Sequence, residues 1–120
     1  MAVNINIEDK IGKHCMITIR DIKDVQLIET IEPSKTLFKK IVNECDLTVV
    51  AEAGYQFQPI GATYIYVLSE SHMSIHTYPE KNSAYMDIFC CNMNFNPELA
   101  VKIISEYFET KNIEWECIYR

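Results

Sequence analysis

Apolar and polar residues alternate along several stretches of the chain, and this period of two is typical of a β-strand with one buried face. Strands are also expected where short apolar runs lie between turn residues. The predicted strands cover residues 14–20, 47–57, 60–68, 84–91 and 113–120. A weaker alternation over residues 1–12 is interpreted as an arm or an edge strand. The pattern therefore predicts a protein with about six strands.

Two segments repeat their apolar residues at helical spacing instead. The first helix is expected to begin with Ser34 as its N-cap, because Pro33 should end any helical turn formed by residues 21–32. Its apolar stripe consists of Leu37, Phe38, Ile41, Val42 and Cys45. The second helix begins at Asn96-Pro97-Glu98, which offers a cap, a proline at the first helical position and an acid near the positive end of the helix dipole. Asn112 is expected to end this helix.

These elements predict an α+β fold, a mainly antiparallel sheet with two helices packed on one of its faces. The strands over residues 60–68 and 84–91 carry apolar residues on both sides, as strands do when both of their faces are buried. Two helices can cover only one face of such a sheet. We therefore expect the other face to pair with a second copy of the chain in a homodimer.

Length and composition narrow the class of protein. The 120 residues fit a single domain, and the apolar fraction of 48% is ordinary for a globular protein. A net charge of −6 argues against nucleic acid as a partner, because phosphate binding needs a basic face, and it suits a small cationic ligand better. No apolar run approaches the ~18 residues of a membrane span, so no membrane partner is expected.

The cysteine count bears on the redox environment. Five cysteines, an odd number without a secretory leader, predict reduced thiols and a cytoplasmic location. Three of them, Cys15, Cys45 and Cys117, lie on apolar stripes and are expected to be small core residues.

Reactive side chains concentrate in residues 68–80, between two predicted strands. They comprise serine and threonine hydroxyls together with His72, His76, Glu70 and Glu80. Such a group is either a rigid active site or the polar face of an exposed strand. A zinc site formed by the two histidines with Cys90 and Cys91 is a third interpretation. Because the chain has no Cys-x-x-Cys pair, and adjacent cysteines on a strand point to opposite faces, we expect no metal.

The order Glu70-Ser71-His72, continued by Ile75-His76-Thr77 and Pro79-Glu80, resembles the self-cleavage and active-site segment of the pyruvoyl-dependent S-adenosylmethionine decarboxylases. Other segments are similar to motifs of the same family: Gly12-Lys13-His14, Asp24 to Glu29, Phe57-Gln58-Pro59-Ile60-Gly61-Ala62-Thr63 and Tyr85 to Cys91. The similarity covers most of residues 12–91 and is ungapped from Phe57 to Cys91. Spacing that is kept over this length is a far stronger signal than one short motif.

The resemblance implies that the chain is a proenzyme that cleaves itself between Glu70 and Ser71. The Ser71 hydroxyl attacks the Glu70 carbonyl to form an ester, and loss of the Ser71 α-proton then expels the Glu70 carboxylate. Hydrolysis of the remaining dehydroalanine releases ammonia and leaves a pyruvoyl group, which is the implied cofactor. The single domain, residues 1–120, would then consist of a β chain, residues 1–70, and an α chain, residues 71–120. Its implied reaction is the decarboxylation of S-adenosylmethionine, which provides the aminopropyl donor for spermidine.

The family roles carry over to five further positions. His76 would take the α-proton of the cleavage-site serine during processing, and Thr63 would hydrogen-bond the ester. Cys91 would return a proton to the substrate as general acid, provided that its thiol stays reduced. Phe57 would stack on the adenine of S-adenosylmethionine, and Glu80 would accept hydrogen bonds from the ribose.

Three alternatives stay open. Lys81-Asn82-Ser83 replaces a connection that often contains glycine and an aromatic residue in the family, and residues 31–43 form a longer segment than in short bacterial members. Either change could reshape the pocket, so that the same machinery decarboxylates a basic amino acid such as ornithine or arginine. A non-enzymatic paralogue that only binds a partner is the second alternative. The third has Cys90 as the proton donor in place of Cys91, although a shift of one residue turns a strand side chain to the other face.

Overall fold

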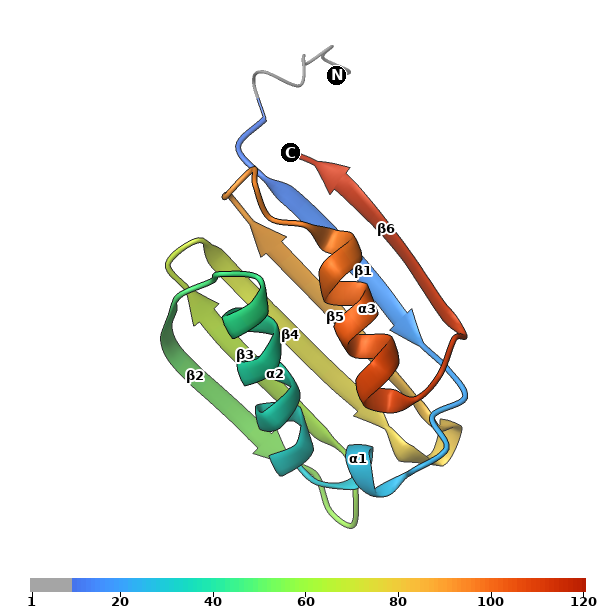
Figure 1. Ribbon diagram of the computed structural model, residues 1–120. Helices are drawn as coiled ribbons and strands as arrows, with labels where there is room; N and C mark the ends of the chain where they lie inside the picture. The colour runs from blue at the N-terminus through green and yellow to red at the C-terminus, as the bar shows by residue number, and fades with distance from the viewer. Residues whose placement is uncertain (1–9) are drawn as a thin grey trace, which may run out of the picture.

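The computed structural model describes residues 10–120, which form a six-stranded sheet with α-helices on one side (Figure 1). The elements follow one another as β1 (Lys13–Ile19), α1 (Gln26–Glu29), α2 (Glu32–Glu44), β2 (Val49–Gln56), β3 (Ala62–Leu68), β4 (Ser71–Tyr78), a 3₁₀ turn (Pro79–Lys81), β5 (Ser83–Cys90), α3 (Pro97–Phe108) and β6 (Ile113–Tyr119). The predicted α+β class is confirmed. The arm predicted over residues 1–12 lies outside the described residues as far as residue 9, and residues 10–12 precede β1.

Every neighbouring pair of strands is antiparallel, and the spatial order is β2-β3-β4-β5-β1-β6. The strands from β2 to β5 are neighbours both in the chain and in the sheet, because short connections join each to the next. β1 instead inserts between β5 and β6, so strands from the two ends of the described chain lie side by side (Figure 1). A cut between β3 and β4 would therefore leave two sets of strands that interleave in one sheet.

The reactive stretch of the sequence is itself a strand. β4 runs from Ser71 to Tyr78 between β3 and β5, so most of residues 68–80 form a strand with one polar face. Met73 and Ile75 point toward the helices and are fully buried. His72, Ser74 and His76 alternate with them and lie on the opposite face. The polar side chains are thus held on a rigid element rather than on a loop.

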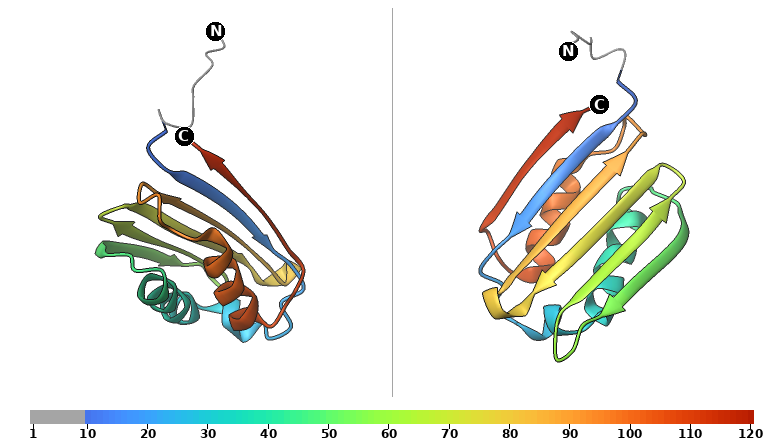
Figure 2. Two further views of the ribbon diagram at one scale, coloured as in Figure 1. Left: turned by 45° about the horizontal axis from the view of Figure 1, so that its top comes forward. Right: turned by 180° about the vertical axis from the view of Figure 1, so that it is seen from behind.

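α2 and α3 lie against the same face of the sheet and contact each other (Figure 2). Their apolar stripes point inward, because residues three and four positions apart share one side of a helix. Phe38 of α2 is fully buried, and its ring centroid lies 5.2 Å from that of Tyr64 and from that of Tyr66, both on β3. Within the described chain, no helix is long and apolar enough to cross a membrane.

α3 begins as the sequence predicts. The Asn96 side chain accepts hydrogen bonds from the backbone N–H groups of Glu98 at 3.0 Å and of Leu99 at 3.4 Å, and Pro97 occupies the first helical position. The helix ends at Phe108, before the predicted end at Asn112. The reason is that Glu109 adopts the left-handed backbone conformation, with φ 51°, which stops helical hydrogen bonding.

The predicted start of α2 is wrong. The helix begins at Glu32, and Pro33 lies in its first turn, where the missing backbone N–H costs no hydrogen bond. Ser34 is therefore inside the helix rather than at its cap, and its buried hydroxyl has no hydrogen-bond partner among the described residues. Pro33 does not stop α1 either, because α1 is a short helix that already ends at Glu29.

None of the described elements covers the other face of the sheet, which we call the open face (Figure 2). Large apolar side chains project from it into solvent. They are Met16, Tyr55, Ile65, Val67, Tyr78, Tyr85 and Ile118. Their exposed fractions run from 37% for Ile65 to 64% for Tyr55. An apolar surface of this kind is typical of an interaction site, so the predicted pairing with a second copy stays a prediction that the fold permits.

The expectation of five reduced thiols is wrong for one pair of cysteines. Cys15 of β1 and Cys117 of β6 oppose each other directly in the strand register and form a disulfide. Cys15 is buried, as predicted for a core residue. Cys45, Cys90 and Cys91 have free thiols. The sequence pattern could not show the pairing, because it contains no information on which strands are neighbours.

Candidate active site

The Glu70–Ser71 bond lies at the tip of the β3–β4 hairpin. Leu68 of β3 pairs with Ser71 of β4, so the loop between them consists of Ser69 and Glu70 alone. Ser71 has a φ angle of 149°, a region that residues with a Cβ atom rarely adopt. Backbone strain of about 1–3 kcal/mol is therefore stored directly after the bond that is predicted to break.

The carbonyl group of the same bond is held by hydrogen bonding. The backbone N–H of Cys91, which directly follows β5, donates a hydrogen bond of 2.8 Å to the Glu70 carbonyl oxygen. The Glu70 carboxylate accepts a hydrogen bond of 3.1 Å from the N–H of Thr48, which lowers the pKa of that carboxyl. The donor on the carbonyl lies where negative charge develops during nucleophilic attack, so the hairpin tip has the geometry of an oxyanion site.

The structure distinguishes the two adjacent cysteines. Cys90 ends β5 opposite Ser71, but its side chain faces the helices and is fully buried, and burial raises the pKa of its thiol. Cys91 is exposed, and its own backbone contacts Glu70. Of the two thiols, that of Cys91 is therefore the one open to a ligand at the hairpin tip.

Four predicted site residues, Phe57, Thr63, His76 and Glu80, line one pocket of about 360 Å³. Thr63 and His76 oppose each other on β3 and β4, and Thr63 Oγ1 lies 3.0 Å from His76 Nδ1, within hydrogen-bond distance. Phe57 directly follows β2, and Glu80 lies in the 3₁₀ turn after β4; both side chains are exposed. We call these four residues the pocket group.

Within one chain, the pocket group does not reach the bond that it is predicted to act on. Ser71 and His76 lie five residues apart on the same strand, which is about 17 Å along its length. A base must be within hydrogen-bond reach of the proton that it removes. Phe57 and Glu80 line the same pocket as His76 and therefore also lie away from Ser71 within one chain. Glu70, Ser71 and Cys91 form a separate cleavage group at the other end of β4.

A polar cluster that the sequence analysis missed lies between the two groups on the open face. Asp87 of β5 accepts hydrogen bonds from His14 of β1 at 2.8 Å, from His72 of β4 at 3.1 Å and from Ser74 of β4. Burial alone would raise the pKa of Asp87, but these hydrogen bonds outweigh it and hold the pKa below its ordinary value. The alternation of polar residues at positions 72, 74 and 76 was the signal that could have placed them on one face.

The ligand atoms of His14, His72 and Asp87 lie within 4.8 Å of one another, so distance alone would allow a metal ion. The hydrogen bonds favour a different arrangement. Arg120 Nη1 lies 3.3 Å from His14 Nδ1, and because arginine only donates, Nδ1 accepts and neutral His14 carries its proton on Nε2, facing Asp87. A metal would need the lone pair of that same nitrogen. The cluster is best described as a hydrogen-bonded network.

A second hollow, of about 400 Å³, shares His76 and Tyr78 with the pocket and extends along the open face. It is lined by Tyr78, Lys81 and Tyr85, none of which the sequence analysis named as a site residue. The two tyrosine rings meet edge to face with centroids 5.4 Å apart. The pocket group therefore lies beside further aromatic surface.

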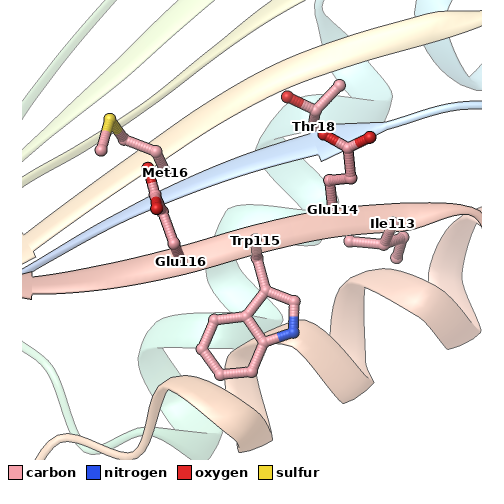
Figure 3. A pocket seen from close by; sticks show the side chains of 6 residues that line it. All are labelled: Met16, Thr18, Ile113, Glu114, Trp115 and Glu116. Carbon is pink, nitrogen blue, oxygen red and sulfur yellow. The ribbon is translucent and has the colours of Figure 1, made fainter.

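A larger hollow, about 570 Å³, lies along the β1–β6 edge of the sheet (Figure 3). It is lined by Met16, Thr18, Ile113, Glu114, Trp115 and Glu116. Glu114 and Glu116 project from one side of β6 and Trp115 from the other (Figure 3). Glu114 is paired with Arg20 at 2.9 Å. Because this hollow contains no residue of the cleavage or pocket group, size alone does not identify the site.

Known proteins share both the sequence pattern and the fold. The family model for S-adenosylmethionine decarboxylase matches residues 13–120. The S-adenosylmethionine decarboxylase proenzyme of Methanococcus aeolicus is 35% identical over 99 residues, which are 82% of this chain and 84% of that protein. The S-adenosylmethionine decarboxylase proenzyme of Archaeoglobus fulgidus is 33% identical over 102 residues, which are 85% of this chain and 90% of that protein.

A solved structure extends this similarity to three dimensions. The crystal structure of the adenosylmethionine decarboxylase from Aquifex aeolicus matches with a TM-score of 0.82 and 31% identity. The match covers 92% of this chain and 91% of that one. On the family match and these relatives together, the chain belongs to the S-adenosylmethionine decarboxylase family.

Proposed function

We propose that the chain is a proenzyme that cleaves itself between Glu70 and Ser71 and then, through a pyruvoyl group formed from Ser71, decarboxylates S-adenosylmethionine. The observation that carries the proposal is the hairpin tip, where a serine with a strained backbone follows a carbonyl that accepts a hydrogen bond from the N–H of Cys91. Family membership supports the substrate. The product would be S-adenosylmethioninamine, the aminopropyl donor for spermidine.

Self-cleavage begins with attack of Ser71 Oγ on the carbonyl carbon of Glu70. The Cys91 N–H stabilises the oxyanion, and the peptide C–N bond breaks as its nitrogen takes up the proton of the hydroxyl. An ester replaces the amide, and relief of the backbone strain at Ser71 favours this step. A base then removes the Ser71 α-proton, which expels the Glu70 carboxylate. Water hydrolyses the resulting dehydroalanine to the pyruvoyl group and ammonia.

His76 is the proposed base, and it can act on Ser71 only if the two residues belong to different chains. We therefore propose a homodimer in which two open faces pack together about 10 Å apart. Its two-fold axis lies between the sheets and runs across the strands, so that the cleavage group of one chain faces the pocket group of the other. The midpoint between Ser71 and His76 on β4 is close to Ser74, which places the axis near the polar cluster.

Two independent observations support this dimer. The open face exposes seven large apolar side chains, and a cluster of exposed apolar side chains is typical of a surface that binds a partner. In addition, each chain contains both halves of the site but keeps them at opposite ends of β4. One two-fold rotation would complete both sites at once.

In the assembled site, the residues of the cleavage group and of the pocket group have different roles. The pyruvoyl group would lie at the start of β4 beside Cys91 and supplies an electron sink for the charge left by CO₂. The Cys91 thiol returns a proton to the substrate α-carbon. Phe57 of the partner subunit offers a face to the adenine, and Glu80 of the partner subunit accepts hydrogen bonds from the ribose. The chain has 17 acidic and 11 basic residues, and the resulting net negative charge attracts a sulfonium cation.

Self-cleavage is tested by intact mass. Denatured and reduced wild-type protein is expected to resolve into residues 1–70 and residues 71–120, with the smaller chain blocked at its amino end. Ser71→Ala is expected to remain one chain and to be inactive, because it lacks the nucleophile. A wild-type chain that stays whole while it releases CO₂ from a substrate would contradict the pyruvoyl mechanism.

The role of Cys91 is tested by comparing it with its neighbour. Cys91→Ala is expected to cleave normally, because the contact with Glu70 comes from the backbone N–H, and to lose about 10²–10⁴-fold in kcat. Cys90→Ala removes a buried thiol and is expected to lower stability more than turnover. Steady-state kinetics and thermal unfolding measure the two effects. Equal losses of turnover at the two positions would refute the assignment of Cys91 as the proton donor.

The composite site is tested by mixing two inactive variants in one cell. Ser71→Ala and His76→Ala each inactivate both sites of a homodimer. A mixed dimer keeps one intact site, formed by the cleavage group of the His76→Ala chain and the pocket group of the Ser71→Ala chain. Random pairing should restore about a quarter of the wild-type turnover, and only the His76→Ala chain should be cleaved. If the mixture stays uncleaved and inactive although mixed dimers form, the site is not shared between chains.

The substrate is tested by measuring CO₂ release from S-adenosylmethionine, ornithine, arginine and lysine supplied separately. Phe57→Ala is expected to lower kcat/KM for S-adenosylmethionine about tenfold through lost stacking. Glu80→Gln is expected to lower it by about 10- to 100-fold through a lost charged hydrogen bond. If ornithine or arginine is the faster substrate and both variants leave its turnover unchanged, the substrate is a basic amino acid.

A further inference from the structure

We infer that the Cys15–Cys117 disulfide ties together the two chains that self-cleavage produces. The inference rests on the proposed cleavage between Glu70 and Ser71. Cys15 precedes that bond and Cys117 follows it, so cleavage places the two cysteines in different chains. The structure joins them across β1 and β6, and the processed protomer is therefore one covalent unit.

The sheet topology shows which boundary between the two chains the disulfide crosses. After cleavage, β1, β2 and β3 belong to the β chain, and β4, β5 and β6 belong to the α chain. Along the order β2-β3-β4-β5-β1-β6 the chain changes at three boundaries, β3/β4, β5/β1 and β1/β6. The third is the least protected, because within residues 10–120 the edge strand β6 pairs with β1 alone and exposes most of its residues. The disulfide crosses this boundary.

The strand register brings the two sulfur atoms together. Cys15 and Cys117 oppose each other directly, with Cα atoms 4.2 Å apart, the close approach of a non-hydrogen-bonded antiparallel pair. Cys15 is 1% exposed, whereas Cys117 is only partly buried. Cys117 is therefore the cysteine that a reagent reaches first.

Formation of the bond requires an oxidant, for which a low-molecular-weight disulfide suffices. The Cys117 thiolate attacks one sulfur of this disulfide, which releases one small thiol and leaves a mixed disulfide on Cys117. Cys15 then attacks the Cys117 sulfur and releases the second small thiol. The two cysteines lose two protons and two electrons, and the small disulfide gains them as two thiols. Cys91 takes no part, so the tie and the proposed catalytic thiol are chemically independent.

The tie changes how the processed protein behaves when it unfolds. Linked chains stay in one molecule, where the effective concentration of each for the other is about millimolar. Unlinked chains separate on unfolding and must meet again by collision. A linked protomer should therefore regain its fold from denaturant more completely than an unlinked one at the same dilution.

The inference is tested on the wild-type protein, held in a glutathione buffer with the oxidised form in excess and then alkylated in denaturant. One covalent species containing both chains is expected without reductant, and two separate chains after reduction. Alkylation should label three cysteines rather than five, and any glutathione adduct is recognised by its added mass. Cys117→Ser should give two chains under both conditions, and Cys45→Ser, the matched control, should behave as the wild type.

Each outcome has a separate meaning. Two chains from the wild type without reductant, together with five labelled cysteines, would overturn the tie while leaving self-cleavage intact. A chain that stays whole after reduction would overturn the proposed cleavage and with it a link between chains. In that case the number of labels still reports on the disulfide itself. Cys117→Ser is expected to keep cleavage and turnover, because Cys117 lies outside the cleavage and pocket groups.

Discussion

The antiparallel register of β3, β4 and β5 fixes where each part of the candidate site lies. Because Ser71 pairs with Leu68 on one side and with Cys90 on the other, the hairpin tip meets the end of β5, and the Cys91 N–H reaches the Glu70 carbonyl. The same register sets His76 opposite Thr63, five residues along the strand. One ladder thus builds one half of the proposed site at each end of β4, and this separation is the reason that the proposed function includes a second chain.

The two faces of the sheet differ in what covers them, and the open face has features that favour binding of a second chain. The helices bury one face in a continuous apolar core, whereas the open face combines exposed apolar side chains with the polar cluster around Asp87. Polar groups are costly to bury unless their hydrogen bonds are made. Asp87 already accepts hydrogen bonds from His14, His72 and Ser74 within its own chain. A partner sheet could therefore cover this network without leaving a buried acceptor unpaired.

The strands that precede the proposed cut alternate in the sheet with those that follow it, and this arrangement allows the fold to stay stable after cleavage. If the chain is cut at the hairpin tip, the strands before and after the cut still alternate across three boundaries of the sheet. The core is shared in the same way, since α2 precedes the cut, α3 follows it and the two helices contact each other. Separating the two chains would mean breaking three β ladders and opening the core, so the fold outlasts the loss of one peptide bond.

Features that depend on neighbours a few residues away could be predicted from the amino-acid sequence. Strand and helix periodicity, the Asn96 cap and the Glu70-Ser71 motif are all local, and the structure confirms the α+β fold, the cap and the positions of five strands, whereas β4 was not predicted as a strand. The start of α2 was wrong, because the choice between Glu32 and Ser34 depends on which residues the core buries.

The division of the candidate site into two groups and the pairing of Cys15 with Cys117 depend on how the strands pair in the sheet, and they could not be predicted from the sequence. Residues 57–91 read as one continuous motif, but antiparallel strands send residues that are close in sequence to opposite ends of the sheet. Strand register likewise joins two cysteines that are 102 residues apart. Register is a relation between strands, and no single segment of the sequence contains it.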